Sequence, residues 1–471
     1  MEEPSRSSEA ADALVLFGVS GDLAGKMLLP ALYRLAASGR NVPVIGMAHA
    51  DWTPGQFVDH VRRRVAQVES RIDHSVFDRF AASLRYVSGD VRDGAAFERL
   101  RKMLGDARHP LHYLAIPPQL FVATADQLAA SGCAKGARIA VEKPFGHDAT
   151  SAHALEAALE RIFDEASIFR VDHYLAARPV QDLLYFRFLN PAIEALWRAG
   201  SVSRVQITLD ECFGVARRGR FYDAVGALQD VVQNHVIQIL AMVAMDLPCT
   251  LDAEAIHAAR LALLQAVEPP TSDDVVRGQY AGYREIEGVA PRSTTETFIA
   301  IRLHIDKPRW RGVPFLIRAG KCLRATSTAV VIDLESAPSP RAATSSSSRE
   351  GNRLRFALGP GRAAIAFEGR ARSIASDSAT EPMALVAERG WADDVDAYQR
   401  LLGAALAGER TFFEREASIE AAWRIFDRLR GAMPEVLAYA PGSWGPTQSE
   451  RLTDGRGWID PPPDTHCESK S

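Results

Sequence analysis

The sequence lacks the features that mark several classes of protein. It has only five cysteines, and no two of them have the spacing of a zinc-ligand pair or a redox dithiol. Its longest apolar run, at residues 237–245, is too short to cross a bilayer, which takes about 20 residues. The net charge of −4 provides no basic field for nucleic acid or an anionic membrane. We therefore expect no metal site, no membrane partner and no nucleic-acid partner, and a location in the reducing cytoplasm.

What remains is an ordinary globular composition, with 47% hydrophobic and 24% charged residues. A chain of 471 residues suits two or three domains. Residues 1–11 are acidic and serine-rich and lack the apolar core of a signal peptide, so we expect a disordered tail. Residues 337–350, rich in Pro, Ala and Ser, predict a surface loop, and the proline-rich residues 459–471 predict a second flexible tail.

The first strand signal is the apolar run Ala13–Phe17, which is followed at once by a glycine turn and a helical pattern at residues 26–38. Strand, glycine turn and helix form the first unit of a dinucleotide-binding fold. Gly18 permits the tight turn, and Gly21 allows the backbone to approach a pyrophosphate. Ala24 is small enough for the helix to pack on the strand. Alone, this variant spacing is as typical of a plain strand-to-helix turn.

Alternating strands and helices continue to about residue 175, with strand signals at 42–47, 84–87, 112–116, 138–146 and 168–171. This alternation predicts an α/β, doubly wound Rossmann domain over residues 12–175. His49 follows the second strand, where an acidic residue favours NAD and an arginine favours NADP. The cofactor choice therefore stays open.

The pattern changes after residue 175. Strand signals at 202–209, 295–305, 313–317 and 329–334 follow one another with few helices between them. Helical patterns appear at 230–245, 253–267, 394–407 and 416–429. Consecutive strands predict a second, α+β domain over residues 176–458, built on a large, mostly antiparallel sheet.

His235 lies in the helical pattern at 230–245. Val231, Val232 and Ile239 stand three or four residues from it, so the imidazole shares an apolar stripe with core side chains. A lone histidine in such company is more often a packed core residue than a catalytic base. Deciding between the two requires an orienting carboxylate and a cofactor site elsewhere in the chain.

Six motifs in order give the chain a resemblance to the glucose-6-phosphate dehydrogenase family. They are Gly18-Val19-Ser20-Gly21-Asp22-Leu23-Ala24, Glu142-Lys143-Pro144-Phe145-Gly146, Arg170-Val171-Asp172-His173-Tyr174-Leu175, Asp230-Val231-Val232-Gln233-Asn234-His235, Arg277-Gly278-Gln279-Tyr280, and Arg309-Trp310-Arg311-Gly312-Val313-Pro314-Phe315 with Gly320-Lys321.

The resemblance implies NADP- or NAD-dependent oxidation of glucose 6-phosphate at C1 to a lactone, the entry step of the pentose phosphate pathway. It makes His235 the general base and Asp172 the carboxylate that orients it. It implies sugar binding by Lys143, Glu211, Asp230 and Lys321, and 6-phosphate binding by His173 and Tyr174. Cofactor binding falls to Gly18, Ser20, Gly21, Asp22, Leu23, His49 and Lys143. It also implies a homodimer or homotetramer.

The chain departs from the family at several positions, most of which carry positive charge in the family. Met27, Ala177 and Thr326 stand where the family has basic residues, His49 replaces a cofactor arginine, and Gly359 replaces a substrate-side glutamine. Lys26, Arg178 and Arg324 lie nearby but out of register. Two alternatives therefore stay open. One is a C1 dehydrogenase acting on a different or unphosphorylated sugar, and the other is a non-catalytic regulatory or dimer partner.

Overall fold

The computed structural model describes residues 10–146, 148–335, 351–359, 362–372, 380–390, 394–429 and 431–461. The predicted loop at 337–350 lies outside these residues, as does most of each predicted tail. The chain forms two compact units. The first comprises Met1–Arg178, Thr250–His257 and Ala392–Glu420, and the second comprises Pro179–Cys249, Ala258–Trp391 and Ala421–Ser471. A single division after residue 175 did not anticipate the two later segments of the first unit.

The first unit is built on a seven-stranded sheet. Its strands, in spatial order, are β3 (Leu84–Ser88), β2 (Val44–Ala48), β1 (Ala13–Phe17), β4 (Pro110–Leu114), β5 (Arg138–Glu142), β6 (Ile168–Val171) and β15 (Phe413–Glu414). All neighbours are parallel except β15, which is antiparallel to β6. The strand order 3-2-1-4-5-6 is that of dinucleotide-binding folds, so the predicted Rossmann architecture is confirmed.

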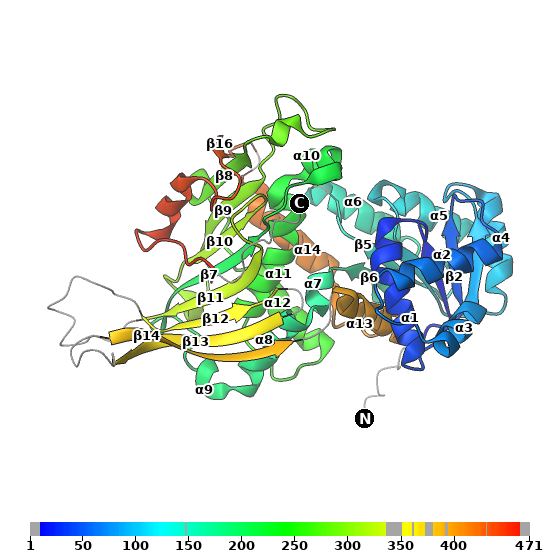
Figure 1. The fold of residues 1–471 in the computed structure, drawn as a ribbon, viewed down its shortest axis with the longest axis horizontal. Helices are drawn as coiled ribbons and strands as arrows, with labels where there is room; N and C mark the ends of the chain where they lie inside the picture. Colours follow the sequence, from blue (N-terminus) through cyan, green and yellow to red (C-terminus); the bar gives the residue numbers. More distant parts are fainter. Residues whose placement is uncertain are drawn as a thin grey trace. The chain divides into compact units, whose positions relative to one another are not determined.

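Helices cover both faces of this sheet. They are the π-helical turn Ala24–Leu28, α1 (Leu29–Ala37), α2 (Pro54–Ala66), α3 (His74–Ser83), α4 (Gly94–Leu104), α5 (Phe121–Ala130), α6 (Ala149–Glu160), α7 (His173–Ala176) and α13 (Asp394–Ala407). Leu14 and Leu16 of β1 belong to a core shared with α1 and α13, which lie side by side in Figure 1. Because strand side chains alternate, Phe17 points to the opposite face, where it stacks on Phe97 of α4 with ring centroids 5.9 Å apart.

The second unit is built on a nine-stranded sheet, seen on the left of Figure 1. Its strands are β14 (Thr380–Gly390), β13 (Arg362–Arg372), β12 (Arg353–Ala357), β11 (Ser327–Leu334), β7 (Val202–Asp210), β10 (Phe315–Gly320), β9 (Phe298–Leu303), β8 (Val275–Tyr280) and β16 (Val436–Tyr439). Neighbours are antiparallel except for the pairs β7–β10 and β8–β16. The predicted mostly antiparallel sheet is therefore confirmed.

The remaining helices are α8 (Arg178–Leu189), α9 (Pro191–Glu194), α10 (Gly219–Ala227), the π-helical segment Leu228–Val236, α11 (Ile237–Ala244), α12 (Ala253–Leu264) and α14 (Glu416–Asp427). No helix among the described residues is both long and apolar enough to cross a bilayer.

The helix around His235 differs from the regular helix predicted over 230–245. Its first part, Leu228–Val236, is π-helical, and only Ile237–Ala244 is α-helical. Within the π-helical part, the Asn234 side chain donates a hydrogen bond to the carbonyl of Gln229 at 2.7 Å. Apolar spacing could not reveal this, because a π-helix differs in the hydrogen-bonding register of its backbone. We call residues 228–244 the His235 helix.

Candidate functional site

The glycine turn after β1 has the backbone geometry of a phosphate-binding turn. Gly18 has φ +77°, and a Cβ on it would stand 2.2 Å from the Ala115 carbonyl oxygen, so only glycine fits. The Gly21 N–H donates to the Gly18 carbonyl at 2.9 Å, which closes the turn. Ser20 and Asp22 are exposed beside it, and Leu23 packs partly against the core. The turn and the helix that follows it fit a dinucleotide pyrophosphate.

His49 follows directly after β2 and is exposed beside a negative and a positive side chain, Asp90 and Arg92. Its Nε2 lies 3.8 Å from a carboxylate oxygen of Asp90. Arg92 binds the same carboxylate through its side chain, at 2.7 and 3.0 Å. The Arg92 bond is the main reason that the pKa of Asp90 lies well below its usual value. The ribose end of the predicted cofactor site thus has an anion next to the position where NADP would need a cation.

Lys143 and Asp172 leave adjacent parallel strands at the same edge of the first sheet. Glu142 of β5 is paired with Val171 of β6, so the residues that follow, Lys143 and Asp172, start side by side. This is the carboxyl edge, where doubly wound folds bind their ligands. Asp172 is 3% exposed and accepts the backbone N–H of Tyr174 at 3.0 Å, which caps α7.

A buried carboxyl group lies directly before Lys143. Glu142 is 8% exposed and accepts a hydrogen bond from the Tyr113 hydroxyl at 2.6 Å. Burial raises the pKa of Glu142 to about 7, although the Tyr113 bond and Lys143 both favour the charged form and Asp172 opposes it. Glu142 stands in a quoted motif, yet the sequence drew attention only to its lysine.

His173 and Tyr174, predicted to bind phosphate, lie on the short helix α7 against α13. The His173 ring stacks on Tyr398 with centroids 5.9 Å apart. The nearby Arg178 donates to the Asp396 carboxylate at 2.6 and 3.2 Å. Part of the charge that Arg178 could offer in place of a lysine at Ala177 is therefore directed to Asp396.

Two other departures have local explanations. Met27 packs against the core of the first unit, whereas the exposed Lys26 points to Asp22, with its Nζ 3.2 Å from the carboxylate. Thr326 accepts the backbone N–H of Cys212 through its hydroxyl at 3.1 Å. Neither Met27 nor Thr326 replaces the positive charge that the family has there.

In the second unit, Glu211 and Lys321 follow the only parallel pair among the central strands of the described sheet. Gly320 of β10 is paired with Asp210 of β7, so the next residues on both strands emerge at one edge. Their side chains form an ion pair, and Lys321 is 8% exposed. The lysine ammonium also lies over two aromatic rings, 5.4 Å from the Phe213 centroid and 5.3 Å from the Tyr222 centroid. The sequence did not single out either ring.

The carboxylates predicted to bind sugar hydroxyls, Glu211 and Asp230, lie near Tyr222. Its hydroxyl is buried and has no hydrogen-bond partner among the described residues. Burial, then Asp230, Glu296 and Glu211 among its charged neighbours, raise the pKa of Tyr222 well above its usual value. Asp230 lies in the first turn of the His235 helix, and His235 itself is 5% exposed. The structure therefore brings Glu211, Asp230 and Lys321 to one region of this unit, whereas Asp172 belongs to the first unit and its pairing with His235 stays a prediction.

Comparison with known proteins covers both units. A family model described as the NAD binding domain of glucose-6-phosphate dehydrogenase matches residues 15–182, and the model of the C-terminal domain matches residues 184–459. The chain belongs to the glucose-6-phosphate dehydrogenase family.

Individual members of that family are similar over nearly the whole chain. Glucose-6-phosphate 1-dehydrogenase 1 of Mycobacterium tuberculosis is 42% identical over 458 residues, which is 96% of this chain and 97% of the relative. The crystal structure of the Mycobacterium avium enzyme has 41% identity and a TM-score of 0.89, covering 96% of this chain and 99% of that one. A glucose-6-phosphate dehydrogenase solved with glucose 6-phosphate has 28% identity and a TM-score of 0.85, covering 96% and 100%.

Proposed function

We propose that this protein oxidises D-glucose 6-phosphate at C1 to 6-phosphoglucono-lactone with NADP or NAD. The observation that carries this proposal is the similarity across both units to enzymes named for this reaction, one of them solved with the substrate. The cluster of Glu211, Lys321 and Asp230 adds support, because charged side chains form strong hydrogen bonds with the hydroxyl groups of a sugar. The same similarity favours this reaction over an unphosphorylated sugar or a non-catalytic role.

In this proposal His235 is the base. Imidazole suits the task because its ordinary pKa lies near neutral pH. The His235 imidazole takes the proton of the C1 hydroxyl as the C1–O bond becomes a carbonyl, and Asp172 orients the ring and stabilises its charged form. When bound, the nicotinamide supplies the acceptor for the hydride that leaves C1.

The other residues bind and align the substrate. Lys143, Glu211, Asp230 and Lys321 hold the sugar hydroxyl groups, and Lys143 also borders the nicotinamide. His173 and Tyr174 hold the 6-phosphate. The turn from Gly18 to Leu23 binds the dinucleotide phosphates, and His49 lies where NAD and NADP differ. Enzymatic rate depends on holding these groups within about an ångström of a productive arrangement.

We further propose that the protein forms a homodimer or homotetramer in the cytoplasm. Three apolar side chains on the edge strand β14 support an assembly surface: Met383 is 44% exposed, Leu385 65% and Val386 53%. Apolar groups on an edge strand are typical of surfaces that pair with another protein. Analytical ultracentrifugation of the purified protein measures the state directly, and a monomer at micromolar concentration would contradict the assignment.

The proposed reaction is tested by following nicotinamide reduction at 340 nm with glucose 6-phosphate, glucose and other aldose phosphates. His235→Asn should lower turnover by about 100-fold or more, because general base catalysis contributes about 10²–10⁴. His112→Asn is the matched control, since His112 is also a buried histidine but its Nε2 is paired with the Cys133 carbonyl. No reduction of either cofactor with glucose 6-phosphate would refute the function, and near-normal turnover of His235→Asn would remove His235 from the mechanism.

A further inference from the structure

The His235 helix begins at a sharp break in the chain. Gly226, two residues before it, has φ +68° and ψ 178°, so α10 and the His235 helix do not run on as one helix. A helix that starts afresh has N–H groups without partners inside the helix. Two of these N–H groups, those of Ala227 and Leu228, are bound by Glu296, a residue that the sequence analysis did not single out.

Glu296 binds the start of the helix through both its side chain and its backbone. Its carboxylate oxygen Oε1 accepts the Leu228 N–H at 3.1 Å, and its carbonyl accepts the Ala227 N–H at 3.0 Å. The residue is 6% exposed. A Cβ on Gly226 would stand 2.5 Å from Oε1, so the glycine leaves the space that the carboxylate fills. A negative charge at a helix N-terminus is also favoured by the helix dipole.

The Arg277-Gly278-Gln279-Tyr280 motif holds Glu296 in place. Arg277 forms an ion pair with the other carboxylate oxygen of Glu296 at 2.7 Å and donates to the Thr294 carbonyl at 2.9 Å. Gln279 donates to the carbonyls of Ser293 and Thr295, at 3.2 and 2.9 Å. The motif therefore binds residues 293–296 to β8. It thereby holds the carboxylate and carbonyl of Glu296, which accept the N–H groups at the start of the helix.

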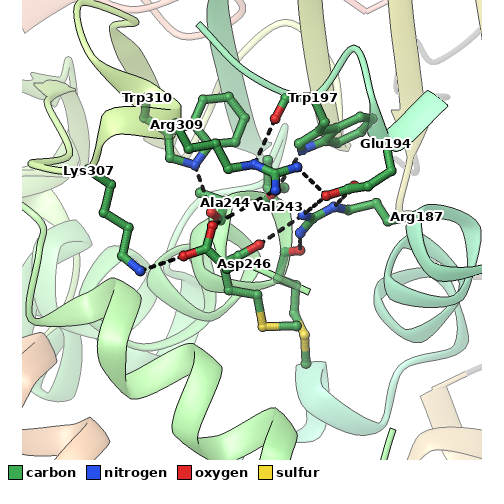
Figure 2. Close-up of polar contacts among 11 residues, drawn as sticks. Arg187, Glu194, Trp197, Val243, Ala244, Asp246, Lys307, Arg309 and Trp310 are labelled. Carbon is green, nitrogen blue, oxygen red and sulfur yellow. Dashed lines mark hydrogen bonds and ion pairs between the residues drawn. The ribbon is translucent and has the colours of Figure 1, made fainter. Parts of the chain in front are cut away.

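The other end of the helix is bound by side-chain donors (Figure 2). Four consecutive carbonyls, from Met242 to Met245, each accept a hydrogen bond from a side chain. Arg187 donates to those of Met242 and Met245 at 2.8 Å, the Trp197 indole to that of Val243 at 2.7 Å, and the Trp310 indole to that of Ala244 at 2.7 Å. The four carbonyls that a helix C-terminus leaves without internal partners are thus all satisfied.

An ion-pair network centred on the buried Arg187 supports these donors. Arg187 is fully buried and donates to both carboxylate oxygens of Glu194 at 3.0 Å. Arg309 pairs with the same carboxylate and donates to the Trp197 carbonyl at 2.7 Å. Arg309 and Trp310 begin the sixth motif, and the predicted chemistry gave no role to its residues 309–315. The positive charge of Arg187 at the C-terminus of the helix also interacts favourably with the helix dipole.

We infer that the two motifs position the His235 helix, with Glu296 holding its start and Arg187, Trp197 and Trp310 holding its end. They fix the helix along its own axis and thereby set where Asp230 and His235 stand. The inference rests on the proposed function, because it concerns the site at which those two residues act. None of the named residues needs to touch the substrate, so they are positioning residues.

The test compares Glu296→Ala and Glu296→Gln in the full chain. Alanine removes both acceptor and charge, whereas glutamine keeps an oxygen for the Leu228 N–H. We expect kcat with glucose 6-phosphate to fall at least tenfold in Glu296→Ala and to recover to within about threefold of the parent in Glu296→Gln, since a displacement of about 1 Å can cost up to 100-fold. The KM for the dinucleotide and the midpoint of the pH profile should not move, because His235 is still the base.

At the other end, Trp310→Phe removes the indole N–H and keeps an aromatic ring. We expect kcat to fall at least fivefold with the protein still folded by circular dichroism. Two controls in the same unit are matched to these changes. Asp274→Asn alters a carboxylate that also caps a turn and binds an arginine, Arg302, at 3.0 Å, and Trp458→Phe removes an indole donor to the Ser449 carbonyl. Both controls should keep kcat within twofold of the parent.

Values of kcat within twofold of the parent in folded Glu296→Ala and Trp310→Phe would overturn the inference, because the contacts would then provide stability alone. If Glu296→Ala fails to fold, the same limit applied to Trp310→Phe decides the question. The proposed function fails separately, through an inactive parent or an active His235→Asn. An inactive His235→Asn beside fully active end variants would refute only the positioning role.

Discussion

Replacing Glu142 by glutamine should change how the stability of the protein depends on pH. Burial raises the pKa of this carboxyl from 4.5 to about 7. The folded protein therefore holds the proton more tightly than the unfolded chain does. The stability gained from that proton is fully present below pH 4.5 and is lost as the pH rises through 7. At about 1.4 kcal/mol for each pH unit, the loss amounts to roughly 3 kcal/mol.

Glutamine has nearly the shape of the protonated acid and still accepts the Tyr113 hydroxyl, but it cannot ionise. Relative to the parent, Glu142→Gln should therefore gain roughly 3 kcal/mol of unfolding free energy between pH 4.5 and pH 8. Urea unfolding at half-unit pH intervals, followed by circular dichroism, measures this difference. Glu98→Gln removes a carboxylate from the exposed surface of α4 and is the control for the loss of one charge.

A difference between Glu142→Gln and the parent that stays constant from pH 4.5 to pH 8 would refute the reasoning. It would mean that folding leaves the pKa of the carboxyl unshifted, despite its 8% exposure and its place beside Asp172.

Two further predictions concern ligand binding. His49→Arg supplies a cation at the ribose end of the predicted cofactor site. Because a charge-assisted hydrogen bond is worth about 1.5–3 kcal/mol, the ratio of kcat/KM for NADP to that for NAD should rise by about tenfold or more. An unchanged ratio in initial-rate assays would show that His49 lies away from the 2′-phosphate. Lys321→Met removes the ammonium that Glu211 binds, and it should raise the KM for glucose 6-phosphate by about tenfold or more. A KM equal to that of the parent would contradict a role for Lys321 in sugar binding.

Local patterns in the sequence predicted the strands, turns and helices whose formation depends on residues adjacent in the chain. The run from Ala13 to Ala24 specified a strand, a turn that requires glycine and a helix, because all three depend on the conformations and sizes of adjacent side chains. The alternation that followed was enough to predict the doubly wound sheet. The motif order then supplied the candidate site residues, which chemistry alone could not have selected from other lysines and carboxylates.

Features that depend on distant contacts could not be predicted. β15 joins the first sheet although residues 413 and 414 follow eight of the nine described strands of the second sheet in the chain, and no local pattern distinguishes its partner. β8 went unnoticed because its glycine and arginine interrupt the apolar pattern, although both belong to a quoted motif. The role of Glu296 depends on where Gly226 breaks a helix 70 residues earlier.

The parallel pairing of β7 with β10 has a consequence for how freely the chain can vary. Glu211 and Lys321 are 110 residues apart in sequence, yet they meet because each follows directly on one of two strands in register. Their meeting depends on that register and on nothing about the length of the intervening chain. Segments between the two strands can lengthen or shorten while the ion pair persists. A slip of one residue in β10, by contrast, would turn Lys321 to the opposite face of the sheet.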